Sequence, residues 1–179
     1  MTVTGSFEIR RATPPDAGLL ATVHRRTVLH AYAGIFPAGT PAPTLDDLTR
    51  QWRRDLADPA TRALVAEDGG RPVGSVATGP DPEGTPEGEL RRLHVLPERW
   101  GRGLGTALHD AALAALGERF AVARLWVLEG NQRARRFYER RGWVPVDGAR
   151  WVAAGVGEVR YRRLVASAPL RSDPRRPWP

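Results

Sequence analysis

The chain contains no cysteine and no lysine. The first absence excludes disulfide frameworks, thiolate zinc sites and cysteine nucleophiles, and the second excludes a Walker A phosphate loop, a lysine Schiff base and a serine–lysine dyad. The few serines lie outside any Gly-x-Ser-x-Gly elbow, and the histidines show no metal-ligand spacing. We therefore expect neither a covalent acyl intermediate on the protein nor a metal site.

Long apolar runs are also missing. No window approaches the roughly 18 apolar residues of a membrane span, and the opening segment MTVTGSFEIRR lacks the apolar core of a signal peptide. We expect a soluble, cytoplasmic protein. The length of 179 residues predicts one domain over residues 1–165, and the Pro- and Arg-rich residues 166–179 are expected to form a flexible tail.

The basic residues are all arginine, 27 of them against 20 acidic residues, and the formal net charge is +7. A basic surface favours anionic ligands in general, whether nucleic acid, phosphate or an acidic protein. Arginine-only usage with abundant Ala, Gly and Pro is typical of the coding bias of a GC-rich bacterium. The charge alone therefore does not identify a partner.

Hydrophobic periodicity and turn residues predict alternating strands and helices. Strands are expected at 7–11, 62–67, 72–78, 89–95, 122–128, 151–154 and 158–164, and helices at 14–30, 45–56, 103–116 and 131–141. Breaker-rich segments at 34–44 and 79–88 are expected to be loops long enough to border a functional site. This order predicts an α/β sheet with helices on both faces.

A glycine-rich segment, residues 97–106, lies between a predicted strand and a predicted helix. Gly101, Gly103 and Gly105 leave backbone amides uncovered, and the helix start adds a partial positive charge, so the turn suits phosphate or pyrophosphate. Arg99 and Arg102 can add cationic contacts. The alternative is a tight turn that needs glycine only for its backbone conformation.

A second segment begins a helix at Asn131 and carries Tyr138 two turns later. Ala134, Phe137 and Tyr138 share one face of this helix. The outward face is expected to carry Arg133, Arg135, Arg136 and Arg140. Taken alone, Asn131 is an N-cap and Tyr138 an aromatic anchor with a locally satisfied hydroxyl.

Together, ELRRLHVLPERWGRGLGTAL and LWVLEGNQRARRFYERRGWV resemble the GNAT family of N-acetyltransferases, over about residues 7–164. The first matches the family's acetyl-CoA motif, Gln/Arg-x-x-Gly-x-Gly/Ala, at Gly103 and Gly105, but Trp100 stands where Gln or Arg is usual. The second is similar to the family's N-x-x-A-x-x-[FL]-Y-x-x-x-GF segment. The resemblance implies a mixed, mostly antiparallel sheet with a splayed parallel pair, 89–95 and 122–128.

The resemblance also implies residue roles. Tyr138 would protonate the departing CoA thiolate, which a phenol of pKa about 10 can do for a thiolate of about 8.5. The amide of Val95 or its neighbour would stabilise the oxyanion, and Asn131 would touch the pantetheine arm. The strand edge of Leu93, His94 and Val95 would pair with that arm. The pyrophosphate would be held by Gly101, Arg102, Gly103, Leu104, Gly105 and Thr106.

The acceptor side is less determined by the sequence. Alternation places Glu89, Leu93 and Val95 on one face, where Glu89 would take the amine proton through a water; the alternative is a solvated carboxylate offset by a neighbouring arginine. His94 is expected to be packed or hydrogen-bonded rather than catalytic. Tyr32 and Phe36 are candidates for walls of the amine pocket, or else core aromatics. Asp46 and Asp47 attract a cationic acceptor or simply begin a helix.

The function indicated is transfer of an acetyl group from acetyl-CoA to a primary amine of a small molecule or protein, directly in a ternary complex. A non-catalytic acyl-CoA-binding module and, less well supported, a nucleic-acid-binding domain are the alternatives. A protein N-terminus or a ribosomal protein is a possible acceptor. Homodimers are common in the family, but nothing in the sequence locates an interface.

Overall fold

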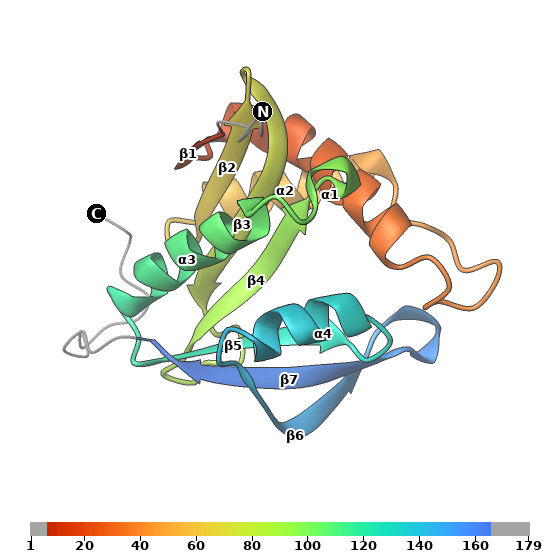
Figure 1. The fold of residues 1–179 in the computed structure, drawn as a ribbon, viewed down its shortest axis with the longest axis vertical. Helices are drawn as coiled ribbons and strands as arrows, with labels where there is room; N and C mark the ends of the chain where they lie inside the picture. The colour runs from red at the N-terminus through yellow and green to blue at the C-terminus, as the bar shows by residue number, and fades with distance from the viewer. Residues whose placement is uncertain (1–6, 166–179) are drawn as a thin grey trace.

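The computed structural model describes residues 7–165. The seven strands form one sheet in the order β1-β2-β3-β4-β5-β7-β6 (Figure 1). The strands are β1 Glu8–Arg11, β2 Arg62–Asp68, β3 Arg71–Pro80, β4 Gly88–Val95, β5 Val122–Leu128, β6 Val144–Trp151 and β7 Gly157–Leu164. The helices are α1 Ala17–Ala31, α2 Leu45–Ala57, α3 Leu104–Gly117 and α4 Gln132–Glu139, with 3-10 turns at Pro14–Asp16, Pro97–Arg99 and Ala153–Gly155. The expected tail at 166–179 lies outside the described residues.

The sheet is antiparallel except where β4 meets β5. These two strands run parallel and pair at only two positions, Gly88 with Ala123 and Glu89 with Arg124. Beyond them the strands diverge into a V, so the remaining edge of β4 has no strand partner on the β5 side (Figure 1). The predicted mixed sheet with a splayed parallel pair is confirmed.

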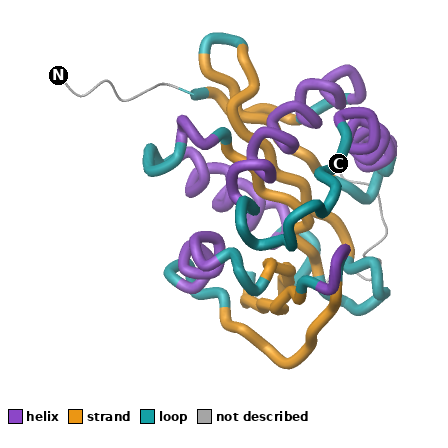
Figure 2. Tube along the Cα trace, turned by 90° about the vertical axis from the view of Figure 1, so that its right-hand side faces the viewer, coloured by secondary structure: helices purple, strands orange, loops and turns teal. Residues whose placement is uncertain are grey.

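Helices cover both faces of the sheet, as predicted (Figures 1 and 2). α1 and α2 pack on one face, where Leu20, Trp52 and Val65 lie in a core cluster. α3 packs on the other face over β2, β3 and β4, and its Leu108 and Leu116 are completely enclosed. α4 lies beside β5 and β7, held by a hydrogen bond that Arg135 donates to the Tyr161 hydroxyl and by one that this hydroxyl donates to Glu139.

A β-bulge in β4 decides which side chains face which helices. The register shifts so that Leu90 pairs with Thr78 and Arg92 with Ala77, which leaves Arg91 without a partner in β3. After the bulge Arg92 and His94 face α2 and α1. The predicted shared face of Glu89, Leu93 and Val95 is therefore wrong, because an inserted residue inverts the alternation. Glu89 lies on the α1–α2 side instead.

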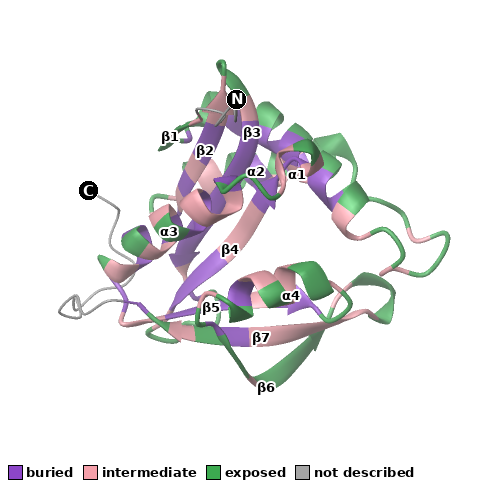
Figure 3. Ribbon diagram, viewed as in Figure 1, coloured by how far each residue is buried: buried purple, intermediate pink, exposed green. Residues whose placement is uncertain are grey.

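The closing strands differ from the sequence prediction. The strand expected at 151–154 is instead β6, which ends at Trp151 and is followed by a 3-10 turn at Ala153–Gly155. β6 is an edge strand that pairs only with β7, and almost all its residues are exposed (Figure 3). It contains Pro145 and Gly148 and a register shift between Val146 and Ala149. Hydrophobic alternation is absent because neither face of the strand is buried.

A buried arginine fastens the β3–β4 loop to β5. Arg124 is 1% exposed and lies 2.5 Å from Asp81, 2.8 Å from Glu83 and 3.4 Å from Glu89. Asp81 is itself buried and also accepts hydrogen bonds from the Glu83 amide and the Thr85 hydroxyl. The loop predicted at 79–88 is thus held in place by a cluster in which the Arg124 guanidinium pairs with three carboxylates.

We expect Arg124→Met to lower the free energy of unfolding by about 3–5 kcal/mol, because it leaves Asp81 and Glu89 buried without a counter-charge. Urea denaturation with an unchanged m-value measures this. Arg26→Met is the control, since the Arg26–Glu98 pair is about half exposed and should contribute roughly 0–1 kcal/mol. Equal losses in both variants would contradict a special role for the Arg124 cluster.

In the described part of the chain, no helix is long and apolar enough to cross a membrane.

Candidate active site

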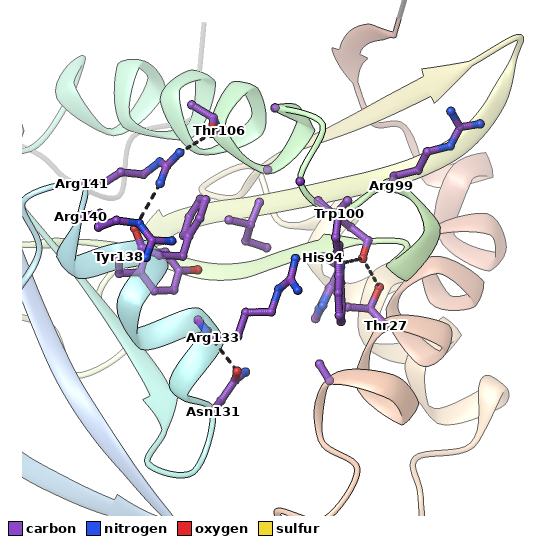
Figure 4. A pocket seen from close by; sticks show the side chains of 18 of the residues that line it. Thr27, His94, Arg99, Trp100, Thr106, Asn131, Arg133, Tyr138, Arg140 and Arg141 are labelled. Carbon is purple, nitrogen blue, oxygen red and sulfur yellow. Dashed lines mark hydrogen bonds between the residues drawn. The ribbon is translucent and has the colours of Figure 1, made fainter. Parts of the chain in front are cut away.

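A cavity of about 550 Å³ opens where β4 and β5 diverge (Figure 4). Its walls come from the C-terminal half of α1, the end of β4, the glycine turn with the start of α3, and the length of α4. The lining residues are Thr27, Ala31, Tyr32, Leu93, His94, Val95, Arg99, Trp100, Gly101, Gly103, Gly105, Thr106, Asn131, Arg133, Ala134, Phe137, Tyr138, Arg140 and Arg141. The two sequence segments that carry the resemblance therefore meet at one cavity.

The glycine turn exposes its backbone to this cavity. Gly101 and Gly103 have φ of 74° and 82°, in the left-handed region that glycine tolerates best. Gly103 is the N-cap of α3 and has no side-chain cap, and the first intrahelical bond there joins the amide of Ala107 to the carbonyl of Gly103. The amides of the first turn are thus free of helical partners and suit an anion.

Two residues predicted for this anion site, Arg102 and Leu104, are not among the residues that line the cavity, although the Leu104 amide belongs to the free first turn of α3. The Leu104 side chain is 2% exposed and lies in the hydrophobic core. Arg99 does line it, and its guanidinium lies 2.6 Å from Asp68.

Further positive charge comes from α4 and the turn after it. Arg133, Arg140 and Arg141 line the cavity, and Arg141 donates a hydrogen bond to the Thr106 hydroxyl while its guanidinium lies 3.9 Å from the Phe137 ring centre. Arg133 and Arg140 lie on the outward face of α4, as predicted. They do point out of the core, but α4 forms one lip of the cleft, so its outward side borders the cavity (Figure 4).

Trp100 links the two lips of the cleft. Its indole N–H donates to the Val95 carbonyl at 2.7 Å, and the Thr27 hydroxyl donates to the same oxygen at 3.1 Å. Across the opening, the Arg133 guanidinium lies 3.9 Å from the Trp100 ring centre. Trp100, which stands where the motif usually has Gln or Arg, thus packs against Arg133 and holds the end of β4 through the hydrogen bond to Val95.

Tyr138 is 7% exposed and lies against the rings of Phe137, His109 and Trp143. Its hydroxyl lies at the cavity (Figure 4) and makes no hydrogen bond to another described residue. The alternative prediction, an aromatic anchor whose hydroxyl is hydrogen-bonded locally, therefore does not describe Tyr138. Burial raises the pKa of Tyr138 well above that of a free phenol. The group is therefore protonated throughout the neutral range and is available as a proton donor.

His109 supports this aromatic cluster through a defined tautomer. The Trp143 indole N–H can only donate, so His109 Nε2 accepts it at 2.9 Å, and Nδ1 then donates to Asp110 at 2.8 Å. His109 is completely buried and has both ring nitrogens hydrogen-bonded. It is a structural histidine beneath Tyr138.

Asn131 caps α4, as the sequence predicted: its Oδ1 accepts the Ala134 amide at 3.1 Å, and the residue also lines the cavity. On the acceptor side, Tyr32 lines the cavity, whereas Phe36 does not and only packs on Tyr32 with ring centres 6.1 Å apart. Burial, with a smaller contribution from Glu158, raises the pKa of Tyr32 to about 12.

Asp47 belongs to the first turn of α2 and not to the cavity. Its backbone amide donates a hydrogen bond to the Thr44 hydroxyl, and its carboxylate pairs with Arg50. Its helix-start interpretation is the one that agrees with the structure. Asp46 also lies in the first turn of α2, and neither residue lines the cavity.

Glu89 is not brought to the cavity. The residue is 6% exposed, and its carboxylate is directed at Arg124, across the parallel pair at the closed end of the V. Burial raises the pKa of Glu89, and the nearby arginines oppose this shift. The sequence analysis offered two roles for Glu89, a base that takes the amine proton through a water and a solvated carboxylate at the strand end. Neither role matches this buried position away from the cavity.

Sequence reasoning missed Thr27, Ala31 and Arg141 as cavity residues. Thr27 and Ala31 follow one another at helical spacing on α1, but nothing in the sequence shows that this helix borders β4. Among the described residues, no group of three or more His, Asp or Glu side chains is arranged to hold a metal ion.

Comparison with known proteins agrees with this geometry. The model of the Acetyltransferase (GNAT) family matches residues 26–143, which include both diagnostic segments. The chain belongs to the GNAT family. It is an N-acetyltransferase that depends on acetyl-CoA. The expectations drawn from the resemblance for family, fold and reaction class are thereby confirmed, and the acceptor is not established by the family.

Relatives of this GNAT enzyme include an uncharacterized N-acetyltransferase of Archaeoglobus fulgidus, 45% identical over 74% of this chain and 89% of the relative. A mycothiol acetyltransferase of Propionibacterium freudenreichii is 33% identical over 72% of this chain, but only 40% of that longer protein is covered. Among solved structures, the PaiA N-acetyltransferase of Thermoplasma acidophilum in complex with coenzyme A has a TM-score of 0.71 at 20% identity, covering 89% of this chain and 99% of that one.

Proposed function

We propose that the enzyme transfers the acetyl group of acetyl-CoA directly to a primary amine of a small molecule or a protein, with both substrates bound together. The observation that carries this proposal is a single cavity that joins the open glycine turn to the unpaired Tyr138 hydroxyl. No serine or threonine nucleophile activated by a base lines this cavity in the described chain, so a two-step transfer through the protein is not supported.

The residues of the cavity fit the donor substrate. The free amides of Gly103, Gly105 and Thr106 suit the pyrophosphate, and Arg99, Arg140 and Arg141 would supply charge to the phosphates. Leu93, His94 and Val95 lie on the stretch of β4 that β5 leaves unpaired, where the pantetheine arm would add as a strand. Asn131 would contact that arm, and the amide of Val95 or its neighbour would stabilise the oxyanion.

Tyr138 supplies the proton for the leaving thiolate in this proposal. Its hydroxyl is unpaired, lies at the cavity and stays protonated, so it is ready to donate. Tyr32 lies on the opposite, α1 side of the cavity and would form a wall for the amine. Phe36 would act only by holding the Tyr32 ring in place.

Acetyl-CoA at a hundredfold excess over its Kd should stabilise the native protein by about 2.7 kcal/mol, a rise in Tm of roughly 5–10 °C for a chain of this size. Thermal unfolding with acetyl-CoA, CoA and longer acyl-CoAs measures this. The same assay with a panel of amines, followed by free thiol release, then identifies the acceptor class. No stabilisation by any of these thioesters would contradict the proposal.

A matched pair of glycine variants tests where the nucleotide binds. Gly103 and Gly84 have φ of 82° and 79°, and a Cβ on either would meet no atom within 4 Å. Alanine at either position should therefore cost similar backbone strain, about 1–3 kcal/mol. Only Gly103→Ala should also weaken acetyl-CoA binding, measured by calorimetry. Equal affinities in the two variants would remove the glycine turn from the binding site.

A further inference from the structure

Amine acetylation releases a proton that some group must accept. Among the described residues that line the cavity, the titratable side chains are two tyrosines, four arginines and His94. Arginine stays protonated, and burial raises the pKa of both tyrosines, so none of these six groups can accept a proton in the neutral range. His94 is the remaining lining side chain with a lone pair that can do so.

The surroundings of His94 differ from those of a structural histidine. His94 lies on the α1 side of β4, 7% exposed, and stacks on His24 with ring centres 3.9 Å apart and an interplanar angle of 20°. Its Nε2 is enclosed and has no hydrogen-bond partner, and its Nδ1 makes no hydrogen bond to a described residue. His109, by contrast, has both nitrogens paired. His94 is thus packed, as predicted, but its ring nitrogens make no hydrogen bond to a described residue.

The unpaired nitrogen belongs to a larger polar patch. His24 Nδ1, the Ser75 hydroxyl opposite His94 on β3, and the Trp52 indole N–H are also enclosed and have no hydrogen-bond partner within residues 7–165. Each such group costs about 1–3 kcal/mol when it is left unsatisfied. Unsatisfied groups of this kind call for an explanation, and a catalytic role is one that fits their place beside the cavity.

The charges around the ring keep it neutral. Burial lowers the pKa of His94 well below that of a free histidine, and His24 from α1 and Arg92 from β4 add to this effect. α2 contributes the uncharged Trp52 and the Asp55 carboxylate, which is paired with Arg92, and β3 contributes the uncharged Ser75. The imidazole therefore has a free lone pair at neutral pH.

We propose that the His94 side chain accepts the proton that the acceptor amine loses during acetyl transfer. The inference rests on the direct transfer proposed above. The amine nitrogen bonds to the thioester carbonyl carbon, the carbon–sulfur bond breaks, and the sulfur takes the Tyr138 hydroxyl proton. The proton of the bonded amine moves to an imidazole nitrogen of His94, and solvent returns it to the Tyr138 oxygen. A weakly basic imidazole suffices, because the nitrogen becomes strongly acidic once it is bonded to carbon.

The test compares His94→Gln and His94→Ala with the wild type, using the amine that gives the fastest thiol release. We expect kcat to fall about 100-fold in both variants, with the Kd of acetyl-CoA within twofold of the wild type. Added imidazole should restore formation of the acetylated amine by His94→Ala, and the more basic 4-methylimidazole should restore more. Assays run below the Tm of every variant, so that the folded enzyme is compared.

His24→Gln is the matched control, since it removes the stacked ring but not a side chain that lines the cavity. Its kcat should stay within a few-fold of the wild type and not respond to imidazole. The proposal is overturned if His94→Gln keeps kcat within threefold, or if His94→Ala loses activity that no imidazole restores. A wild type that releases no thiol with any amine would instead contradict the direct transfer to amines, and with it this role.

Discussion

Tyr138→Phe should lower kcat by about 10²–10⁴-fold, the range of general acid catalysis, while acetyl-CoA affinity changes little. The variant removes only a hydroxyl that has no partner among the described residues, so the packing of the ring against Phe137, His109 and Trp143 is retained. Steady-state thiol release and calorimetric titration with acetyl-CoA give the two numbers.

The control for this variant is Tyr161→Phe. Tyr161 is completely buried, whereas Tyr138 is 7% exposed; the Tyr161 hydroxyl is hydrogen-bonded to Arg135 and Glu139, and the residue does not line the cavity. That variant should lose stability and keep turnover. Since the pKa of Tyr138 is raised, the wild-type profile should show no alkaline loss from this group below about pH 10. Unchanged kcat in Tyr138→Phe would remove the phenol from the mechanism.

Acidification from pH 7 to pH 5 should destabilise the protein by about 2 kcal/mol through His24 alone, and His94 should add to this loss. Burial lowers the pKa of His24 to about 4 and that of His94 well below its ordinary value, and in both cases neighbouring charge adds to the shift. Below about pH 6.5 each of these histidines binds a proton in the unfolded chain but not in the native state. Each one therefore lowers the free energy of unfolding by about 1.4 kcal/mol per pH unit. The contribution of His24 to the free energy of unfolding is lost completely once the pH has fallen through the pKa of His24 in the folded state.

His109 adds to this loss, because burial lowers its pKa as well, although Asp110 opposes the shift. Glu89 acts in the opposite sense, since its raised pKa favours the native state on acidification. Urea denaturation at several pH values measures the sum. His24→Gln should flatten the curve by one histidine's share. A wild-type stability that is flat from pH 7 to pH 5 would contradict buried neutral histidines.

Local signals in the sequence predicted most elements correctly. Thr44 caps α2 because its hydroxyl accepts the Asp47 amide, and the Asp68-Gly69 signal corresponds to a hairpin whose turn glycines, Gly69 and Gly70, both have positive φ. These choices depend on side-chain and backbone chemistry within a few residues. The sequence did not predict β6 because this strand has no local hydrophobic pattern. It pairs only with β7, and no buried face requires apolar residues at alternate positions.

The candidate site was predicted unevenly. Tyr138, Asn131 and the glycine turn are marked by motif spacing, and the structure brings them to one cavity with Tyr32. Glu89 was assigned to the wrong surroundings, because a single inserted residue at Arg91 changes the face of every residue before it. Its partner Arg124 is 35 residues away, and local sequence does not encode such a pairing.

The sequence by itself determined the order of elements, the glycine turn before α3 and the exclusion of cysteine and lysine chemistry, since each depends on residue identity or on neighbours along the chain. Only the tertiary structure decided which side chains share the cavity. The divergence of β4 and β5, the bulge in β4 and the stacking of His24 on His94 all join segments distant in sequence. Burial against such distant neighbours also sets the pKa of each ring, and so determines which groups can give or take a proton.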